Sequence, residues 1–176
     1  CGTTPAHIQT LANAVASQSV PRLGVRPRLA VTSRAQAVVV DFQNPCRIIG
    51  ERINPTGKAE LTADLQSGAV GRAVALAQGQ VTQGADILDV NVGAPMVDET
   101  VMLPAVVEAI SRRLSTPLCL DSSNPEALRR GLESYPASPL INSISGEPGR
   151  MELLAPLCRD YGAPCILLPL QGKKLP

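Results

Sequence analysis

The sequence predicts an α/β fold of the TIM-barrel type, a (β/α) repeat of which about five of the eight strands are present. Three observations indicate it: short apolar runs recur along the chain, helical patterns separate them, and in four of the five runs the apolar stretch gives way to Asp, Asn or Glu. The runs lie at residues 47–54, 87–93, 117–121, 140–146 and 165–171. A flavodoxin-like sheet would also fit the length, but it concentrates its site at one switch point. Polar groups at so many strand ends therefore favour the rim of a barrel.

The third run shows the strand-to-helix junction most clearly. Leu118 to Leu120 suit a buried parallel strand, and Asp121 closes the run. Ser123 is expected to cap the following helix, with Glu126 as its reciprocal partner. Asp121 therefore stands where parallel α/β proteins bind their ligands, at the carboxyl end of a strand. A capping or purely structural aspartate is the alternative.

The composition argues against several classes of partner. With 176 residues the chain can bury a core as one domain, and a net charge of +1 gives no electrostatic case for nucleic acid or a membrane surface. Aromatic residues make up 2%, too few for a platform that stacks single-stranded nucleic acid. No apolar run has the length of a transmembrane helix, and no signal peptide is present. The five cysteines form no CxxC pair, which indicates a reducing, cytoplasmic compartment.

Two segments precede the first predicted strand. Residues 1–16 contain a short helical pattern, which is expected to begin at Thr4-Pro5. Residues 17–45 have no helical period and are rich in Pro and Arg, as in a linker. Within this linker, 29–32 and 38–40 are two apolar runs that predict a small hairpin. In a barrel such a hairpin could plug one end.

Each helical pattern between the predicted strands carries one apolar face that would pack on the sheet. Asp98 is expected to start one of these helices. The predicted inward-facing residues are Val70, Val74, Ala77, Val81, Leu103, Val107, Ile110, Leu114, Leu128, Leu132, Met151, Leu154 and Cys158.

Four strand-end motifs are specific when they are taken together. They are Gly50-Glu51-Arg52-Ile53-Asn54-Pro55, Asp89-Val90-Asn91-Val92-Gly93, Leu120-Asp121-Ser122-Ser123 and Asn142-Ser143-Ile144-Ser145. In this order and with these gaps they resemble the pterin-binding barrel of folate-dependent methyltransferases, over about residues 47–176. The members meant are cobalamin-dependent methionine synthase and the methyltetrahydrofolate:corrinoid/iron–sulfur protein methyltransferase. Dihydropteroate synthase shares the barrel, but its strand-end motifs differ.

The N-terminal segment resembles another family. Cys1-Gly2-Thr3-Thr4-Pro5 is similar to the tail of a homocysteine S-methyltransferase domain, in which such a cysteine binds zinc. The resemblance makes Cys1 a remnant zinc ligand of an incomplete site, because Cys1 and His7 alone do not supply the three or four ligands that zinc needs. We therefore expect residues 1–16 to be that tail, 17–45 a linker and 46–176 the N-terminal part of the pterin-binding barrel.

Together the resemblances imply part of a methyltransferase that binds 5-methyltetrahydrofolate as its substrate. It would pass the methyl group to a corrinoid, in methionine synthesis from homocysteine. Cobalamin would belong to a partner corrinoid-binding domain or protein, and zinc only to the missing homocysteine domain of the same full-length chain. A methyltetrahydrofolate:corrinoid/iron–sulfur protein methyltransferase is one alternative, and a catalytically inactive fragment or binding module is another. In the family a further Asp and Asn bind the pterin from strands that would lie beyond Pro176.

The resemblance also implies roles for six strand-end residues. Asp121 would accept hydrogen bonds from the N3–H and the 2-amino group of a pterin together, a charge-assisted pair with strict geometry. Asn142 and Asn91 can each donate and accept, so they would satisfy other edges of the ring. The further pterin-binding candidates are Glu51, Asn54 and Asp89; these three and Asn91 could instead be structural, for example by bracing loops at the barrel top. No residue is assigned as catalytic, because none is identified as the acid that would protonate N5 of the folate.

Overall fold

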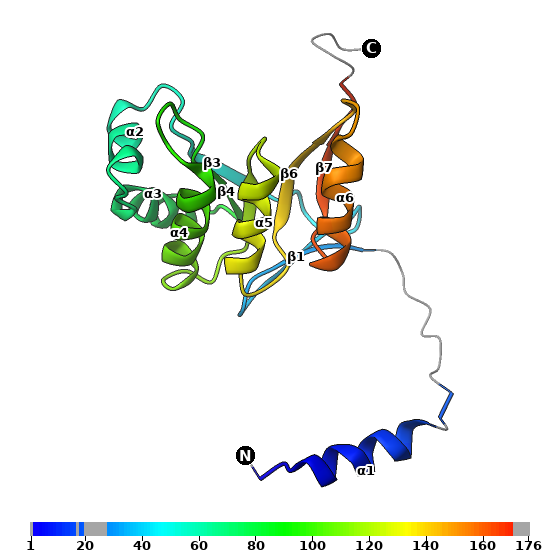
Figure 1. The fold of residues 1–176 in the computed structure, drawn as a ribbon. Helices are drawn as coiled ribbons and strands as arrows, with labels where there is room; N and C mark the ends of the chain where they lie inside the picture. Colours follow the sequence, from blue (N-terminus) through cyan, green and yellow to red (C-terminus); the bar gives the residue numbers. More distant parts are fainter. Residues whose placement is uncertain (1, 17, 20–27, 171–176) are drawn as a thin grey trace.

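The computed structural model describes residues 2–16, 18–19 and 28–170. Five parallel strands form one sheet in chain order: β3 (Ile49–Ile53), β4 (Ile87–Asn91), β5 (Leu118–Asp121), β6 (Leu140–Ser145) and β7 (Cys165–Leu168). The helices along it are α2 (Ala59–Gln66), α3 (Gly71–Thr82), α4 (Glu99–Ser111), α5 (Pro125–Ser134) and α6 (Arg150–Asp160) (Figure 1). Sequential strand order is that of a barrel, whereas a flavodoxin-like sheet would reverse its order at one point. The prediction of a partial TIM-barrel-type fold is therefore confirmed.

The sheet separates an apolar layer under the helices from an inner face that carries polar groups. In β4, Leu88 and Val90 belong to the core beneath the helices, whereas Ile87 belongs to a second cluster on the inner face. Side chains alternate along a strand, so Asp89 and Asn91 share the inner face with Ile87.

Helices α4 and α5 pack through the residues that their periodicity predicts. The buried residues among those predicted are Leu103, Val107, Ile110, Leu128 and Leu132. Leu114 lies just beyond the end of α4 and is partly buried against the same core. These two helices therefore cover the face of the sheet that lies opposite the polar inner face.

Two predicted helix faces differ from the observed ones. In α3 the predicted Ala77 is buried, together with Ala73 and Gln80, whereas the predicted Val70, Val74 and Val81 are only partly buried. Small alanine side chains let the helix lie close to the sheet, which periodicity alone does not reveal. In α6, Leu154 is buried but Met151 is 48% exposed. Helix α6 is the last in the row, so no further helix among the described residues covers its outer side (Figure 1).

Polar side chains cap the helices that follow β4 and β5. Asp98 accepts a hydrogen bond from the backbone N–H of Thr100 at 2.9 Å, which confirms it as the N-cap of α4. The prediction that Ser123 caps α5 was wrong, because Asn124 holds that position and accepts from the N–H of Glu126 at 3.0 Å. Pro125 occupies the first helical position, so the residue directly before it becomes the cap.

A hairpin closes the end of the sheet at which the strands begin. Strands β1 (Leu29–Thr32) and β2 (Ala37–Val40) pair antiparallel, which confirms the predicted hairpin (Figure 1). Val31 is fully buried in the inner-face cluster, together with Ile87, Cys119 and Leu140. The hairpin therefore plugs the amino end of the strands, and the carboxyl end is left for a site.

Tyr135 ties this hairpin to the sheet. Its hydroxyl donates to the carbonyl of Thr32 at 2.8 Å and accepts from the N–H of Leu118 at 3.2 Å. Tyr135→Phe leaves both backbone groups without that partner, so we expect a loss of about 1–3 kcal/mol in the free energy of unfolding. Urea denaturation measures it, with Tyr161→Phe on the exposed end of α6 as the control. A loss no larger than that of the control would show that the tie is unimportant.

The outer edges of β3 and β7 are unpaired among the described residues. Leu167 of β7 is 59% exposed, so an apolar strand edge is open to another chain. We expect the chain to self-associate, and Leu167→Lys to weaken that association, as measured by sedimentation velocity. Val101→Lys on α4, where the native side chain is 58% exposed but lies away from any edge, is the matched control. A monomer at every concentration would contradict this expectation.

The N-terminal helix α1 (Pro5–Ala16) begins at the predicted Thr4-Pro5 start. None of its residues is buried. Within the described ranges, no helix is both long and apolar enough to cross a membrane. Cys1, the predicted remnant zinc ligand, lies outside the described residues, so the zinc expectation stays a prediction.

Candidate functional site

Three of the predicted site residues meet at the carboxyl end of the sheet. The strand register pairs Asn91 with Asp121, and Asp121 with Asn142. Because side chains at paired positions of parallel strands point the same way, the carboxylate of Asp121 lies between two amides on the inner face. The sequence predicted this group, and strand pairing is what brings it together.

Asn91 holds Asp121 in place. Its Nδ2 donates to Oδ2 of Asp121 at 2.8 Å, and its Oδ1 accepts from the N–H of Gly93 at 2.8 Å. Both ends of the amide are engaged within the protein, which fixes its orientation. This hydrogen bond occupies one acceptor position of the Asp121 carboxylate, which leaves further positions for a ligand.

Asn142 presents an acceptor in the same layer. Its Nδ2 donates to Oδ1 of Asp89 at 3.2 Å. A carboxylate can only accept, so the nitrogen of the amide must face Asp89 and the oxygen must face away from it. The rim therefore offers two acceptors next to each other, one from Asp121 and one from Asn142.

Two hollows flank Asp121. One of about 290 Å³ is bordered by β6 and the start of α6, and includes Asn142, Glu147 and Arg150 in its wall. The other, of about 490 Å³, is bordered by the loops after β3 and β4, and includes Asn91 and Glu99. Asp121, Ser122 and Ser123 line both, so the junction after β5 is the centre of the site.

Asp89 lies two residues earlier in β4 than Asn91, one layer below the rim. It is only 2% exposed and lines neither hollow that flanks Asp121. Burial raises its pKa to about 6, although hydrogen bonds from Cys119 and Asn142 act in the opposite direction. The nearby charges of Asp121 and Glu51 raise it further.

Asp121 itself is also harder to ionise than an ordinary aspartate. Burial raises its pKa most, and the negative charges of Glu51 and Glu99 raise it as well, whereas hydrogen bonding with Asn91 and Asp89 lowers it. Carboxyl groups whose pKa values are raised in this way gather at functional sites, although structural networks show the same effect.

Glu51 and Asn54 brace the loop that follows β3. Nδ2 of Asn54 donates to Oε1 of Glu51 at 3.3 Å, and Oδ1 of Asn54 accepts from the N–H of Thr56 at 3.0 Å. Lys58 donates to the backbone carbonyl of Asn54 at 3.0 Å. These contacts favour the bracing alternative for both residues, and Thr56 is the part of this loop that reaches the larger hollow.

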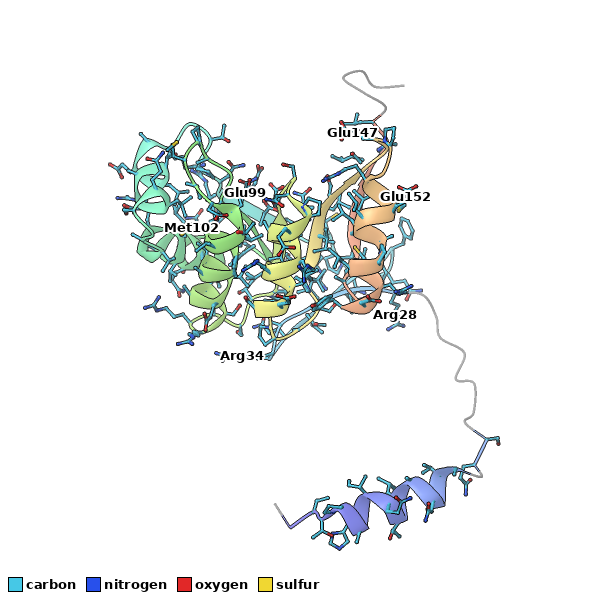
Figure 2. The ribbon with its side chains drawn as sticks, in the orientation of Figure 1. Arg28, Arg34, Glu99, Met102, Glu147 and Glu152 are labelled. Atoms are coloured by element: carbon cyan, nitrogen blue, oxygen red, sulfur yellow. The ribbon has the colours of Figure 1, made fainter. Side chains whose placement is uncertain are left out.

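Sequence reasoning missed four polar residues at the rim. Ser122 is 4% exposed and donates to Oε2 of Glu99, which begins α4. Arg150, at the start of α6, donates to the carbonyl of Ser123 at 2.9 Å. Glu99 and Glu147 lie at the same end of the sheet, opposite Arg34 in the hairpin turn (Figure 2). These residues could have been predicted from their positions in the sequence, because each of them follows the carboxyl end of a predicted strand.

The comparison with protein families agrees with this geometry. The model of the family described as "Pterin binding enzyme" matches residues 50–175, well over half of the chain. The chain belongs to the pterin-binding enzyme family. The matched range contains all six predicted pterin-binding residues. It begins at residue 50, so it does not test the resemblance of residues 1–16 to a homocysteine methyltransferase domain.

Solved structures similar to this pterin-binding chain include dihydropteroate synthases. The enzyme from Yersinia pestis in a sulfonamide drug complex is 25% identical, with a TM-score of 0.56 over 82% of this chain and 52% of that one. A dihydropteroate synthetase with its product is 25% identical, with a TM-score of 0.55 over 84% and 53%. The Xanthomonas albilineans enzyme with 4-aminobenzoic acid is 20% identical, with a TM-score of 0.56 over 82% and 52%. The chain thus spans about half the length of these structures.

Proposed function

We propose that this chain is the pterin-holding part of a folate-dependent methyltransferase of the methionine synthase type. It binds 5-methyltetrahydrofolate and presents the N5 methyl group to a corrinoid on a partner domain or protein. The observation that carries the proposal is the pair of acceptors that Asp121 and Asn142 offer side by side at the carboxyl end of the sheet.

This acceptor pair suits a pterin. The ring carries N3–H and a 2-amino group next to each other, and both are donors. An ionised carboxylate has about four acceptor positions on its two oxygens, and Asn91 occupies one of them on Oδ2, so Asp121 can still accept both donors at once. Hydrogen bonds to a partly buried carboxylate are stronger than those between neutral groups, so Asp121 is the main anchor.

Asp121 acts by positioning the substrate. The methyl group leaves a tertiary amine, which is a poor leaving group until N5 gains a proton. Asp121 would hold the far edge of the ring, so its contribution is to aim N5 toward the open end of the sheet. The corrinoid, when bound there, would supply the nucleophilic cobalt that accepts the methyl group.

Dihydropteroate synthesis is the second candidate function. It is favoured by the solved structures, one of which holds 7,8-dihydropteroate and another 4-aminobenzoic acid. The motifs Asp89-Val90-Asn91-Val92 and Asn142-Ser143-Ile144-Ser145 favour the methyltransferase instead. Both reactions need the same anchor for the pterin ring, so they differ in the second substrate.

Isothermal titration of the full chain separates these functions. We expect 5-methyltetrahydrofolate to bind more tightly than 7,8-dihydropteroate, and 4-aminobenzoic acid not to bind. Tighter binding of 7,8-dihydropteroate, together with binding of 4-aminobenzoic acid, would support the synthase instead. If a folded chain binds none of the three, the pterin-holding role is wrong, and a binding module for another ligand takes its place.

A further inference from the structure

Asp89 is a buried carboxyl group that lies outside both hollows at the rim. It is 2% exposed. Its Oδ1 accepts from Asn142, while no N–H or O–H group of the described chain donates to its buried Oδ2; the only other donor that acts on this carboxyl group is the weakly donating thiol of Cys119. A buried carboxylate that is only half satisfied is costly, so its presence directly beneath the site calls for a role.

That role follows from the chemistry of the amide above it. An asparagine side chain can turn over and present either its oxygen or its nitrogen to a ligand. An ionised Asp89 accepts but cannot donate, so it holds Nδ2 of Asn142 and leaves Oδ1 for the ligand. A neutral carboxylic acid can do both, so it would tolerate either orientation of the amide.

We propose that Asp89 is a positioning residue that sets the hydrogen-bonding sense of Asn142, so that the rim accepts ligands which present a donor, such as a ring N–H, at this edge. The inference rests on the proposed function, because it assumes that a pterin occupies the rim. In this role Asp89 does not touch the pterin itself but acts on it through Asn142. It also adds a specificity element to the site: a ligand with an acceptor at that edge is rejected while Asp89 is ionised.

The groups that face Asp89 make its charge sensitive to pH. Glu51 of β3 and Asp121 of β5 favour the neutral form through their negative charges, whereas hydrogen bonds from Cys119 of β5 and Asn142 of β6 favour the ionised form. Burial is the largest effect and also favours the neutral form, with a pKa of about 6 as the result. The hold on Asn142 is therefore expected to weaken as the pH falls through about 6.

The test is the affinity for 5-methyltetrahydrofolate between about pH 5.5 and about pH 8, measured by titration of the full chain. Asp89→Asn is the decisive variant, because it keeps the shape and imitates the neutral acid at every pH. We expect the parent to lose about fivefold in affinity across this range as the pH falls, which is the difference between a charged and a neutral hydrogen bond. Asp89→Asn should start about fivefold weaker at the upper pH and lose less affinity as the pH falls, because only the contribution of Asp121 remains. Asp98→Asn, the same change at an exposed helix cap, should follow the parent.

The outcomes separate the inference from the function. If Asp89→Asn binds like the parent at every pH, Asp89 only fills space and the inference is wrong, while the proposed function stands. If the folded parent binds no pterin, the proposed function fails and the inference with it. Should the variant not fold, the ¹⁵N signal of the Asn142 side chain in the parent decides. We expect it to shift through about pH 6, and a signal that does not move would overturn the inference.

Discussion

Asp121→Ala is expected to weaken the binding of 5-methyltetrahydrofolate by about a hundredfold, or about 3 kcal/mol. The substitution removes the carboxylate that accepts two neighbouring donors of the ring, and each hydrogen bond to a charged group is worth about 1.5–3 kcal/mol. Nothing else in the described part of the rim offers a carboxylate between two amides. Isothermal titration of the variant beside the parent measures the change, after circular dichroism has shown that both are folded.

A matched control separates the charge from the shape. Asp121→Asn keeps the size of the side chain but replaces one acceptor by a donor, so it should also bind far more weakly than the parent. Asp98→Ala removes an exposed helix cap that lines neither hollow and should leave the affinity unchanged. Binding of Asp121→Ala within about threefold of the parent would place the pterin elsewhere.

Asp89→Asn is expected to stabilise the fold by up to about 3 kcal/mol at about pH 8. The pKa of Asp89 is about 6 in the folded chain and 3.8 as its ordinary value, and one unit is worth about 1.36 kcal/mol. Because the folded-state pKa is raised, its contribution to stability is fully present below about pH 4 and is lost as the pH rises through about 6. The variant has no such group, so its advantage should appear only at the higher pH.

Urea denaturation at about pH 4.5 and about pH 8 tests this. Asp121 and Asp89 influence each other's pKa, so the difference between the two proteins reports the loss of Asp89 together with its effect on Asp121. A variant that is less stable than the parent at the higher pH would show that the carboxylate stabilises the fold. Greater stability together with weaker ligand binding would show that Asp89 is kept for the site and not for the fold.

The strand ends could be predicted from the sequence because they depend on local pattern. Short apolar runs that stop at Asp121 or Asn142 predicted both the barrel topology and the residues that meet at its rim. The hairpin was predictable for the same reason, since two apolar runs flank a short polar turn. In each case a buried strand is followed directly by polar residues, so the pattern can be recognised from residues that are neighbours in the sequence.

Other features depend on distances that the pattern does not contain. On α3 the predicted Ala77 is buried, but the prediction missed Ala73, and the predicted valines are only partly buried because the small alanines decide how closely the helix approaches the sheet. Met151 was expected inside because its spacing fits, but α6 lies at the end of the row of helices. Asp89 was a weaker candidate for the pterin site, and the strand register pairs it with Cys119, two residues before Asp121, which places it one layer deeper. Glu99 and Arg150 join the rim only because their helices begin there.

The most direct test of the pterin-holding rim is a crystal structure of the chain with 5-methyltetrahydrofolate. We predict the pterin at the carboxyl end of β5, with N3–H and the 2-amino group within hydrogen-bonding distance of the Asp121 carboxylate and with Oδ1 of Asn142 turned toward the ring. A pterin bound away from Asp121, or a rim that stays empty at saturating ligand, would contradict the account.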